Sequence, residues 1–199
     1  MSTAIAPPLR AKLVLADAVP GHRIRDAVLI VCGALLTAAA AQIAVHVPPS
    51  PVPITGQTLA VIVAGASLGA RRGAASQALY LLLGFVLPVY ADGAHGVSVL
   101  WGATGGYLVG FVAAAGAVGW LAERGADRRM PAAVATFALG QLLIFGIGVP
   151  WLQVSTGMSW ERAIHDGFAI FIVGGIVKAA VAGVLTPAAW RLVRRVDGD

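Results

Sequence analysis

The sequence has 199 residues, of which 58% are hydrophobic and 12% are charged, and its mean hydropathy is +0.84. Soluble domains carry about 25% charged residues, and a soluble fold of this size has too little interior to hide so much apolar surface. The net charge of +5 does not indicate a nucleic-acid partner, because the basic residues gather in short connections between apolar segments. We therefore expect an all-α protein embedded in the lipid bilayer.

The N-terminal 25 residues differ from the rest of the chain. They are polar and contain Pro7, Pro8 and Pro20, which predicts a flexible cytoplasmic tail with at most one short interfacial helix. The apolar run that follows has no clear small-residue cleavage site, so we expect a retained membrane span and not a cleaved signal peptide. The single cysteine, Cys32, lies in this run and argues against a cysteine-based metal site.

Six apolar segments follow one another along the chain. A helix rises about 1.5 Å per residue, so roughly 20 apolar residues cross about 30 Å of hydrocarbon. The candidate spans are residues 27–47, 54–70, 73–91, 99–122, 131–151 and 167–190. Together they predict one membrane domain over residues 26–199, a polytopic bundle of six transmembrane helices.

The basic residues fall on one side of this predicted bundle. They precede the first span, connect the second to the third and the fourth to the fifth, and follow the sixth: Arg10, Lys12, Arg23, Arg25, Arg71, Arg72, Arg124, Arg128, Arg129, Arg191, Arg194 and Arg195. The connections on the other side hold one arginine, Arg162. Because basic loops stay in the cytoplasm, we predict a multi-pass plasma-membrane protein with cytoplasmic N and C termini.

The three connections on the outer side have unusual compositions. Residues 46–57 contain four prolines, residues 87–107 are rich in glycine and aromatic residues, and residues 152–166 are the most polar. Irregular backbone near membrane depth is tolerated where it lines a water-filled cavity or is covered by protein. These loops therefore favour a pocket that opens outward, and the alternative is that they are ordinary connectors.

Lys178 is a charged residue inside the last apolar segment. A lysine at the centre of a membrane helix costs roughly 2.5–3.5 kcal/mol on insertion scales, and such residues usually face the bundle interior. No acidic residue lies within four positions of Lys178, so its counter-charge has to come from another segment or from a ligand. A substrate carboxylate satisfies this requirement; the alternative is a lysine that extends to a membrane surface.

Other polar and aromatic side chains are candidates for the wall of the same pocket. They occur in the outer connections or within the apolar segments, and they comprise Thr55, Gln57, Asp92, Trp101, Tyr107, Gln141, Trp151 and Asp166. Each by itself is typical of a hydrogen bond in a loop or between helices. Together they suit an apolar pocket with a few convergent polar groups.

Three strings in the sequence resemble a known family. VPITGQTLAVIVAGASLGARRGAASQALYLLLGFVLPVYA at 52–91, GATGGYLVGF at 102–111 and GGIVKAAVAGVLTPAAW at 174–190 are similar to the BioY family, the biotin-specific substrate-binding (S) subunits of energy-coupling-factor (ECF) transporters. The resemblance extends from the first span onward. It implies six membrane helices, an outward pocket for biotin, and assembly with a transmembrane coupling protein and two cytoplasmic ATPases. It implies neither an enzyme nor a cofactor.

The resemblance also implies roles for individual residues. Lys178 falls on the family's ligand-binding lysine, and biotin offers a carboxylate for it. The family often has an aspartate three positions earlier, where this sequence has Gly175, and a proline where it has Ala103. Because positions 175 and 178 share one helix face, we keep Gly175 among the site positions.

Small residues in the first span suggest a contact with a partner. Ala34, Ala38 and Ala41 lie on or near one face of this helix, and small residues let helices approach closely. The BioY family uses an Ala-x-x-x-Ala surface on this helix to bind its coupling protein. The alternative is packing inside the chain's own bundle.

Other functions stay open at the level of the sequence. GASLG at 65–69 matches a nucleophile motif that needs a strand–turn–helix setting, whereas Ser67 lies in a predicted membrane helix. His46, His95 and His165 in outer loops offer imidazoles for nickel or cobalt capture, although their spacing matches no ligand motif. The sequence contains no P-loop, so any ATPase is a partner, and an S subunit or solo carrier for another small anion is the remaining alternative.

Overall fold

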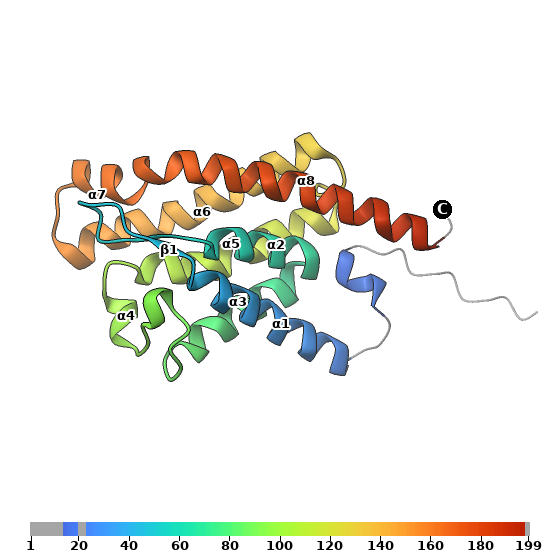
Figure 1. The fold of residues 1–199 in the computed structure, drawn as a ribbon, viewed down its shortest axis with the longest axis horizontal. Helices are drawn as coiled ribbons and strands as arrows, with labels where there is room; N and C mark the ends of the chain where they lie inside the picture. Colours follow the sequence, from blue (N-terminus) through green and yellow to red (C-terminus); the bar gives the residue numbers. More distant parts are fainter. Residues whose placement is uncertain (1–13, 20–22, 198–199) are drawn as a thin grey trace, which may run out of the picture.

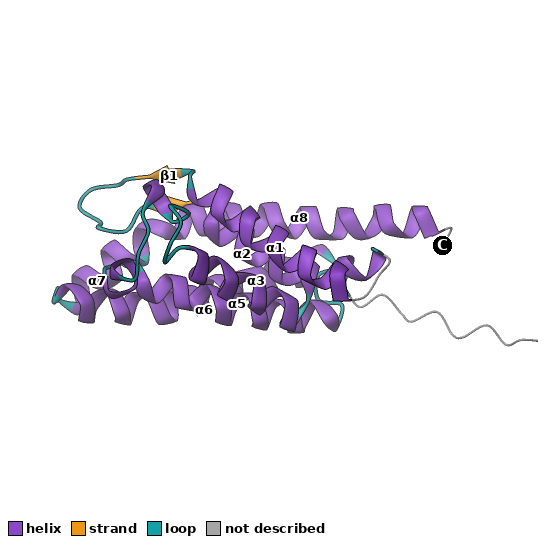
Figure 2. Ribbon diagram, turned by 90° about the horizontal axis from the view of Figure 1, so that it is seen from below, coloured by secondary structure: helices purple, strands orange, loops and turns teal. Residues whose placement is uncertain are grey.

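The computed structural model describes residues 14–19 and 23–197, which form a helical bundle (Figures 1 and 2). Its longer helices are α1 (Arg23–Ala41), α2 (Gln57–Leu68), α3 (Ala70–Leu83), α5 (Gly105–Glu123), α6 (Met130–Thr156) and α8 (Ile172–Asp197). The short elements are η1 (Leu15–Ala18), η2 (Ala91–Gly93), η3 (Ala169–Phe171), α4 (Ser98–Trp101), α7 (Trp160–Gly167), and the strands β1 (Ala44–Val45) and β2 (Ile54–Thr55). The predicted all-α membrane fold is therefore confirmed.

Two of the six predicted spans are shorter than expected. Four helical segments are long and apolar enough to cross a membrane: α1, α5, α6 and the stretch Trp160–Val193 that includes α8. In contrast, α2 has 12 residues and α3 has 14, which correspond to about 18 and 21 Å of helix. The expected boundaries 54–70 and 73–91 are wrong because β2 occupies the start of the first segment and a loop follows Leu83.

Loops and helices on the predicted outer side also differ from the sequence-based expectation. The fourth span begins at Gly105 instead of residue 99, because α4 ends at Trp101 and a turn separates the two helices. The connection expected at 152–166 is largely helical: α6 continues to Thr156, and α7 follows after three residues. The polarity of this segment reflects the exposed face of a short amphipathic helix and not a loop.

Close helix packing explains why the short helix α2 is so apolar. It packs against α1, α3, α5 and α8, so its side chains face protein on most sides. A Cβ atom added to Gly65 of α2 would lie 2.6 Å from the carbonyl oxygen of Ala115 in α5, and one added to Gly73 of α3 would lie 2.9 Å from the Cα of Gly65. These contacts require glycine, and they draw α2, α3 and α5 together.

The small residues of α1 face the interior of the bundle. Ala34, Ala38 and Ala41 are 0%, 8% and 0% exposed, and the neighbouring Thr37 hydroxyl donates a 3.1 Å hydrogen bond to Gln77 of α3. The predicted partner-binding surface is therefore corrected: these alanines let α1 approach α2 and α3 within the same chain. The exposed face of α1 carries larger apolar side chains, among them Val28, Val31, Leu35 and Leu36.

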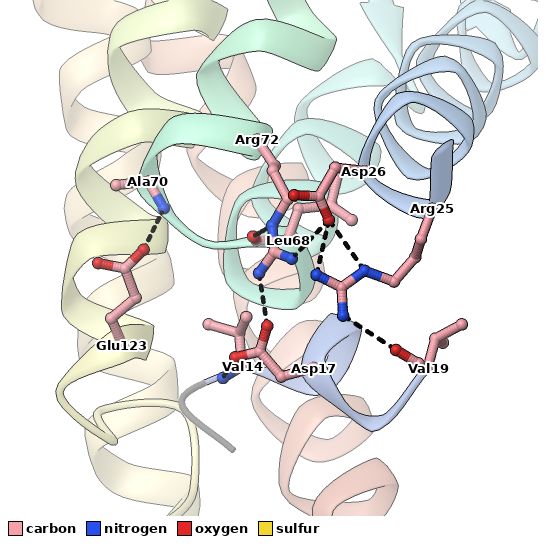
Figure 3. A network of polar contacts seen from close by, with 9 residues as sticks. All are labelled: Val14, Asp17, Val19, Arg25, Asp26, Leu68, Ala70, Arg72 and Glu123. Atoms are coloured by element: carbon pink, nitrogen blue, oxygen red, sulfur yellow. Dashed lines mark hydrogen bonds and ion pairs between the residues drawn. The ribbon is translucent and has the colours of Figure 1, made fainter. Parts of the chain in front are cut away.

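A network of charged residues joins the N-terminal segment to the bundle (Figure 3). Arg72 of α3 bonds Asp17 of η1 at 2.8 Å and Asp26 of α1 at 3.2 Å, and its Nε donates to the carbonyl of Leu68. The Nε and Nη2 of Arg25 also donate hydrogen bonds to the Asp26 carboxylate. Residues 14–19 of the expected tail thus pack against the end of the bundle, whereas residues 1–13 and 20–22 lie outside the described residues.

The bundle has two dissimilar ends. The loops around β1, α4 and α7 gather at one end, and the C-terminal end of α8 and the start of α1 lie at the other (Figure 1). Arg25 and Arg72 belong to the second end. There the indole of Trp190 in α8 donates a 2.6 Å hydrogen bond to the buried Asp127 of the α5–α6 connection, which fixes the position of α8.

Candidate functional site

A cavity of about 230 Å³ lies at the loop end of the bundle. Its volume is close to the lower end of the range for small-molecule sites. The first and second outer connections, α2, α5, α6, η3 and α8 contribute to its lining. The lining residues are His46, Pro51, Val52, Pro53, Thr55, Gln57, Thr58, Tyr90, Ala91, Asp92, Ala94, Val99, Thr104, Tyr107, Leu108, Phe111, Gln141, Phe145, Phe171, Gly175 and Lys178. Segments distant in sequence thus build a single site.

Lys178 reaches this cavity from α8. Its Nζ donates hydrogen bonds of 2.6 Å to the carbonyl oxygen of Thr55 and 2.9 Å to the hydroxyl of Thr58. Both acceptors belong to the segment where β2 ends and α2 begins. They are neutral, so they orient the ammonium group without cancelling its charge. The structure therefore brings a cation to the wall of a largely apolar cavity.

A second polar group is held rigidly beside the lysine. The Nε2 of Gln57 donates to the Tyr80 hydroxyl at 2.6 Å, and the Gln57 Oε1 accepts from the Thr55 hydroxyl at 2.8 Å. The Tyr80 hydroxyl in turn donates to the carbonyl of Val89 at 3.1 Å. This chain of hydrogen bonds connects α2, α3 and the second outer loop.

Two contacts tie the proline-rich segment over the mouth of the cavity. The Nε2 of His46 lies 3.1 Å from an Asp92 oxygen in η2, and the Ser50 hydroxyl donates a 2.7 Å hydrogen bond to the carbonyl of Asp166 in α7. Pro51 and Val52, which directly follow Ser50, belong to the cavity lining. The first outer loop is thus fixed to the second and the third, and it covers the site.

Aromatic rings form one wall of the cavity. Phe145 of α6 packs edge-to-face on Tyr107 of α5 and lies 5.7 Å, centroid to centroid, from Phe171 of η3. The Tyr107 hydroxyl is turned away to the carbonyl of Gly167, to which it donates at 2.9 Å. This wall suits an apolar ring system on a ligand.

The structure brings together seven of the ten residues that the sequence suggested for the substrate site; Trp101, Trp151 and Asp166 are the exceptions. Lys178, Asp92, Gln57, Thr55, Tyr107, Gln141 and Gly175 all line the cavity. Trp101 does not: it is 70% exposed and packs on Trp151, outside the lining. Asp166 is buried next to His165, with a 2.7 Å contact, and it also lies outside the lining.

Several lining residues were missed by the sequence analysis. Phe111 lies four positions after Tyr107, and Phe145 lies four positions after Gln141, so helical spacing from the predicted residues would have identified both. Thr58 directly follows Gln57. Val52 and Phe171 carry no such signal, because only the tertiary fold brings the first outer loop and η3 to the cavity.

The outer-loop histidines are separated in the structure. His46 contacts Asp92, and His165 contacts Asp166. Within residues 14–19 and 23–197, no group of three or more histidine, cysteine, aspartate or glutamate side chains is arranged to hold a metal ion. Ser67 lies within helix α2, which does not provide the strand–turn–helix setting of the nucleophile motif.

Comparisons with known proteins identify the family of this chain. Residues 10–195 match the profile described as the BioY family. Biotin transporter BioY2 of Lactococcus lactis subsp. cremoris is 36% identical over 157 residues, which cover 78% of this chain and 85% of that protein. The probable biotin transporter BioY of Pyrococcus horikoshii is 36% identical over 162 residues, which cover 81% and 93%.

A solved structure shares the fold. It is the crystal structure of the S-component for biotin from an ECF-type ABC transporter, with a TM-score of 0.76, 20% identity, and coverage of 88% of this chain and 92% of that chain. At this level of identity the likeness establishes the fold alone. The profile match over nearly the whole chain, together with the two relatives above 30% identity, shows that this membrane protein belongs to the BioY family.

Proposed function

We propose that this chain is the membrane-embedded, substrate-binding S component of an ECF-type transporter, and that it captures biotin. The names of its relatives, biotin transporters from several bacteria and an archaeon, support the substrate. One observation in the structure carries the proposal: a cavity of ligand size holds a lysine among apolar and aromatic walls. Biotin has an apolar sulfur-containing ring, fused to a neutral cyclic urea, and an acidic tail; the ring and the tail match these two features.

Lys178 pairs with the carboxylate of biotin in this proposal. Its ammonium group is held by the carbonyl of Thr55 and the hydroxyl of Thr58, which are neutral. A charge in an apolar setting is costly unless it is paired, so an anionic ligand gains from entering. Among the described lining residues the acidic side chain is Asp92, and it contacts His46 at 3.1 Å, which favours an anion from outside the chain.

In the proposed orientation, the cavity opens to the outside of the cell, and both termini lie in the cytoplasm. The arginines of α1, α3, the α5–α6 connection and the end of α8 belong to the end of the bundle opposite the loops around β1, α4 and α7 (Figure 1). Basic ends stay cytoplasmic, and this supports the orientation. Biotin then enters from outside and binds beneath the first outer loop, which Ser50 connects to α7 and His46 connects to η2.

The partners proposed for transport are a transmembrane coupling protein and two cytoplasmic ATPases. The fold shared with the S-component of an ECF-type ABC transporter supports them. Because Ala34, Ala38 and Ala41 are buried, they are not proposed as the contact. Uptake measured with and without a co-expressed coupling protein and ATPases distinguishes a coupled S component from a solo carrier: a coupled component transports only with them.

Binding of labelled biotin to the purified full chain in detergent tests the function. We expect saturable binding, and Lys178→Met is expected to weaken it by more than about 1.5 kcal/mol, the lower limit for hydrogen bonds to charged groups. Lys178→Ala is expected to cause similar loss, and biotin amide is expected to bind much more weakly than biotin. Absence of biotin binding would refute the substrate, whereas equal affinity for biotin and its amide would refute the pairing with Lys178.

A further inference from the structure

Gln141 is a buried amide in the wall of the cavity, and its acceptor atom is unpaired. The residue lies in the middle of α6 and is 5% exposed. Its Nε2 donates to the carbonyl oxygen of Gly175 in α8 at a long distance of 3.5 Å. Its Oε1 is buried and has no hydrogen-bond donor among the residues that the structure describes.

The orientation of this amide follows from chemistry. Turning it over would place Oε1 against the Gly175 carbonyl, so that two acceptors would face each other without a proton between them. Nε2 therefore faces Gly175, and Oε1 is the group left for a ligand. The last torsion of a glutamine side chain has a broad energy profile, so the amide can adjust its orientation at little cost when a ligand binds.

Gly175 leaves room beside the amide. The nearest atom to a Cβ added there is the Nε2 of Gln141, at 3.9 Å, an ordinary van der Waals contact. Gly175 also lies three positions before Lys178 on the same helix, and both residues line the cavity. On α8, the ammonium group of Lys178 therefore lies about one helical turn from the open space beside Gly175. Gln141 of α6 lies on the other side of that space.

The polar groups around this space carry no negative charge. Of the described lining residues, Asp92 is acidic, and it belongs to η2 at the mouth, where it contacts His46. A neutral oxygen accepts a hydrogen bond from a neutral N–H group. It does not compensate a full positive charge in an apolar cavity, because burial of an unpaired cation is costly.

We infer that Gln141 is a specificity-determining residue that accepts an N–H of a neutral cyclic urea and discriminates against a cationic guanidine of the same shape. This rests on the proposed function, since biotin supplies the urea. The inference assigns the two ends of the ligand to different elements: the carboxylate to Lys178 and the urea to the space between Gln141 and Gly175.

The experiment measures the affinity of the purified full chain for biotin and for 2-iminobiotin at neutral pH, where the guanidine group of the analogue is protonated. Wild type is expected to prefer biotin. Gln141→Met is expected to weaken biotin binding about tenfold or more, the cost of an unpaired buried donor, while the ratio of affinities for biotin and biotin amide stays as in wild type. Gly175→Asp is expected to raise the affinity for iminobiotin relative to biotin at least tenfold.

Gln153→Met is the matched control. Gln153 lies in the same helix and also donates from Nε2 to a carbonyl oxygen, that of Met158, but it does not line the cavity. The control is expected to bind both ligands as wild type does. Equal biotin affinity in Gln141→Met and Gln153→Met would overturn the role of Gln141 and leave biotin capture intact, whereas a wild type that binds neither ligand would refute the proposed function itself.

Discussion

At the residue scale, the site depends on how a few polar groups are satisfied in an apolar bundle. Lys178 is held by neutral oxygens of Thr55 and Thr58. Gln57 is satisfied on both its amide atoms, by Tyr80 and Thr55. Groups held in this way lose little freedom when a ligand arrives, and such preorganisation contributes to affinity.

Tyr80→Phe tests the hydrogen-bond chain behind Gln57. The change removes one hydroxyl, so the Gln57 Nε2 loses its acceptor and the Val89 carbonyl loses its donor. We expect a loss of about 1–3 kcal/mol in the free energy of unfolding, because a buried polar group is left unpaired, and weaker biotin binding. Thermal unfolding in detergent with and without biotin measures both effects; unchanged stability would mean that the Tyr80 hydroxyl is not needed for the site.

At the element scale, the first outer loop connects α1 to α2 and covers the cavity. The β1–β2 pairing of Ala44 with Thr55 closes its base. Ser50 fastens its middle to α7, and His46 contacts Asp92 in η2. The exposed His46–Asp92 pair contributes little, since surface ion pairs are worth about 0–1 kcal/mol, so the Ser50 hydrogen bond is the stronger tie.

Ser50→Ala is expected to loosen this loop. It removes the 2.7 Å hydrogen bond to the Asp166 carbonyl, worth about 0.5–1.5 kcal/mol, so we expect biotin to dissociate about two- to tenfold faster. Ser155→Ala is the control, because the Ser155 hydroxyl bonds Leu152 within its own helix. Dissociation measured by chase with unlabelled biotin compares the two; equal rates would show that the loop does not retain the ligand.

Glycine packing between α2, α3 and α5 sets the geometry of the helices that carry the site. In Gly73→Ala the new Cβ would lie 2.9 Å from the Cα of Gly65. Relieving this contact requires the backbone of one helix to shift, which costs more than moving a side chain. We expect a loss of about 1–3 kcal/mol. Gly116→Ala is the matched control: its Cβ meets Ala74 at an ordinary 3.6 Å, and alanine favours the helix. A Gly73→Ala protein as stable as the control would contradict the close approach of these helices.

At the scale of the whole molecule, the candidate site and the cluster of basic residues lie at opposite ends of the bundle. The loop end holds the cavity, and the other end holds the arginines and the network around Arg72. Figure 2 shows the same separation from a second direction, with β1 and α7 at one end and the C-terminal end of α8 at the other. Ligand binding and the cytoplasmic charges are thus kept on opposite sides of the membrane in the proposed orientation.

The orientation is testable by cysteine labelling. In a Cys32→Ala background, Glu161→Cys in α7 is expected to react with a membrane-impermeant maleimide on intact cells. Arg129→Cys, at the α5–α6 connection, is expected to react only after permeabilisation. Both positions are exposed, so differences in reaction report the side of the membrane. Labelling of position 129 from outside would invert the proposed topology.

The sequence by itself determined the fold class and indicated seven of the residues that line the cavity. Apolar composition predicted the helical membrane bundle, and an isolated lysine in an apolar segment identified Lys178, because such a charge has no place facing lipid. Gln57, Tyr107 and Gln141 were suggested as polar groups that could converge on an apolar pocket, and all three line the cavity.

Only the tertiary structure decided which apolar segments were long enough to be membrane spans and which small residues faced inward. Hydropathy does not distinguish a helix surrounded by protein from one surrounded by lipid, so α2 was predicted as a full span although it has 12 residues. Ala38 was predicted to contact a partner but is buried against its own chain. Trp101 was predicted in the site but lies at the end of α4, exposed and outside the cavity lining. Contacts between distant segments decide these outcomes, and no local pattern encodes them.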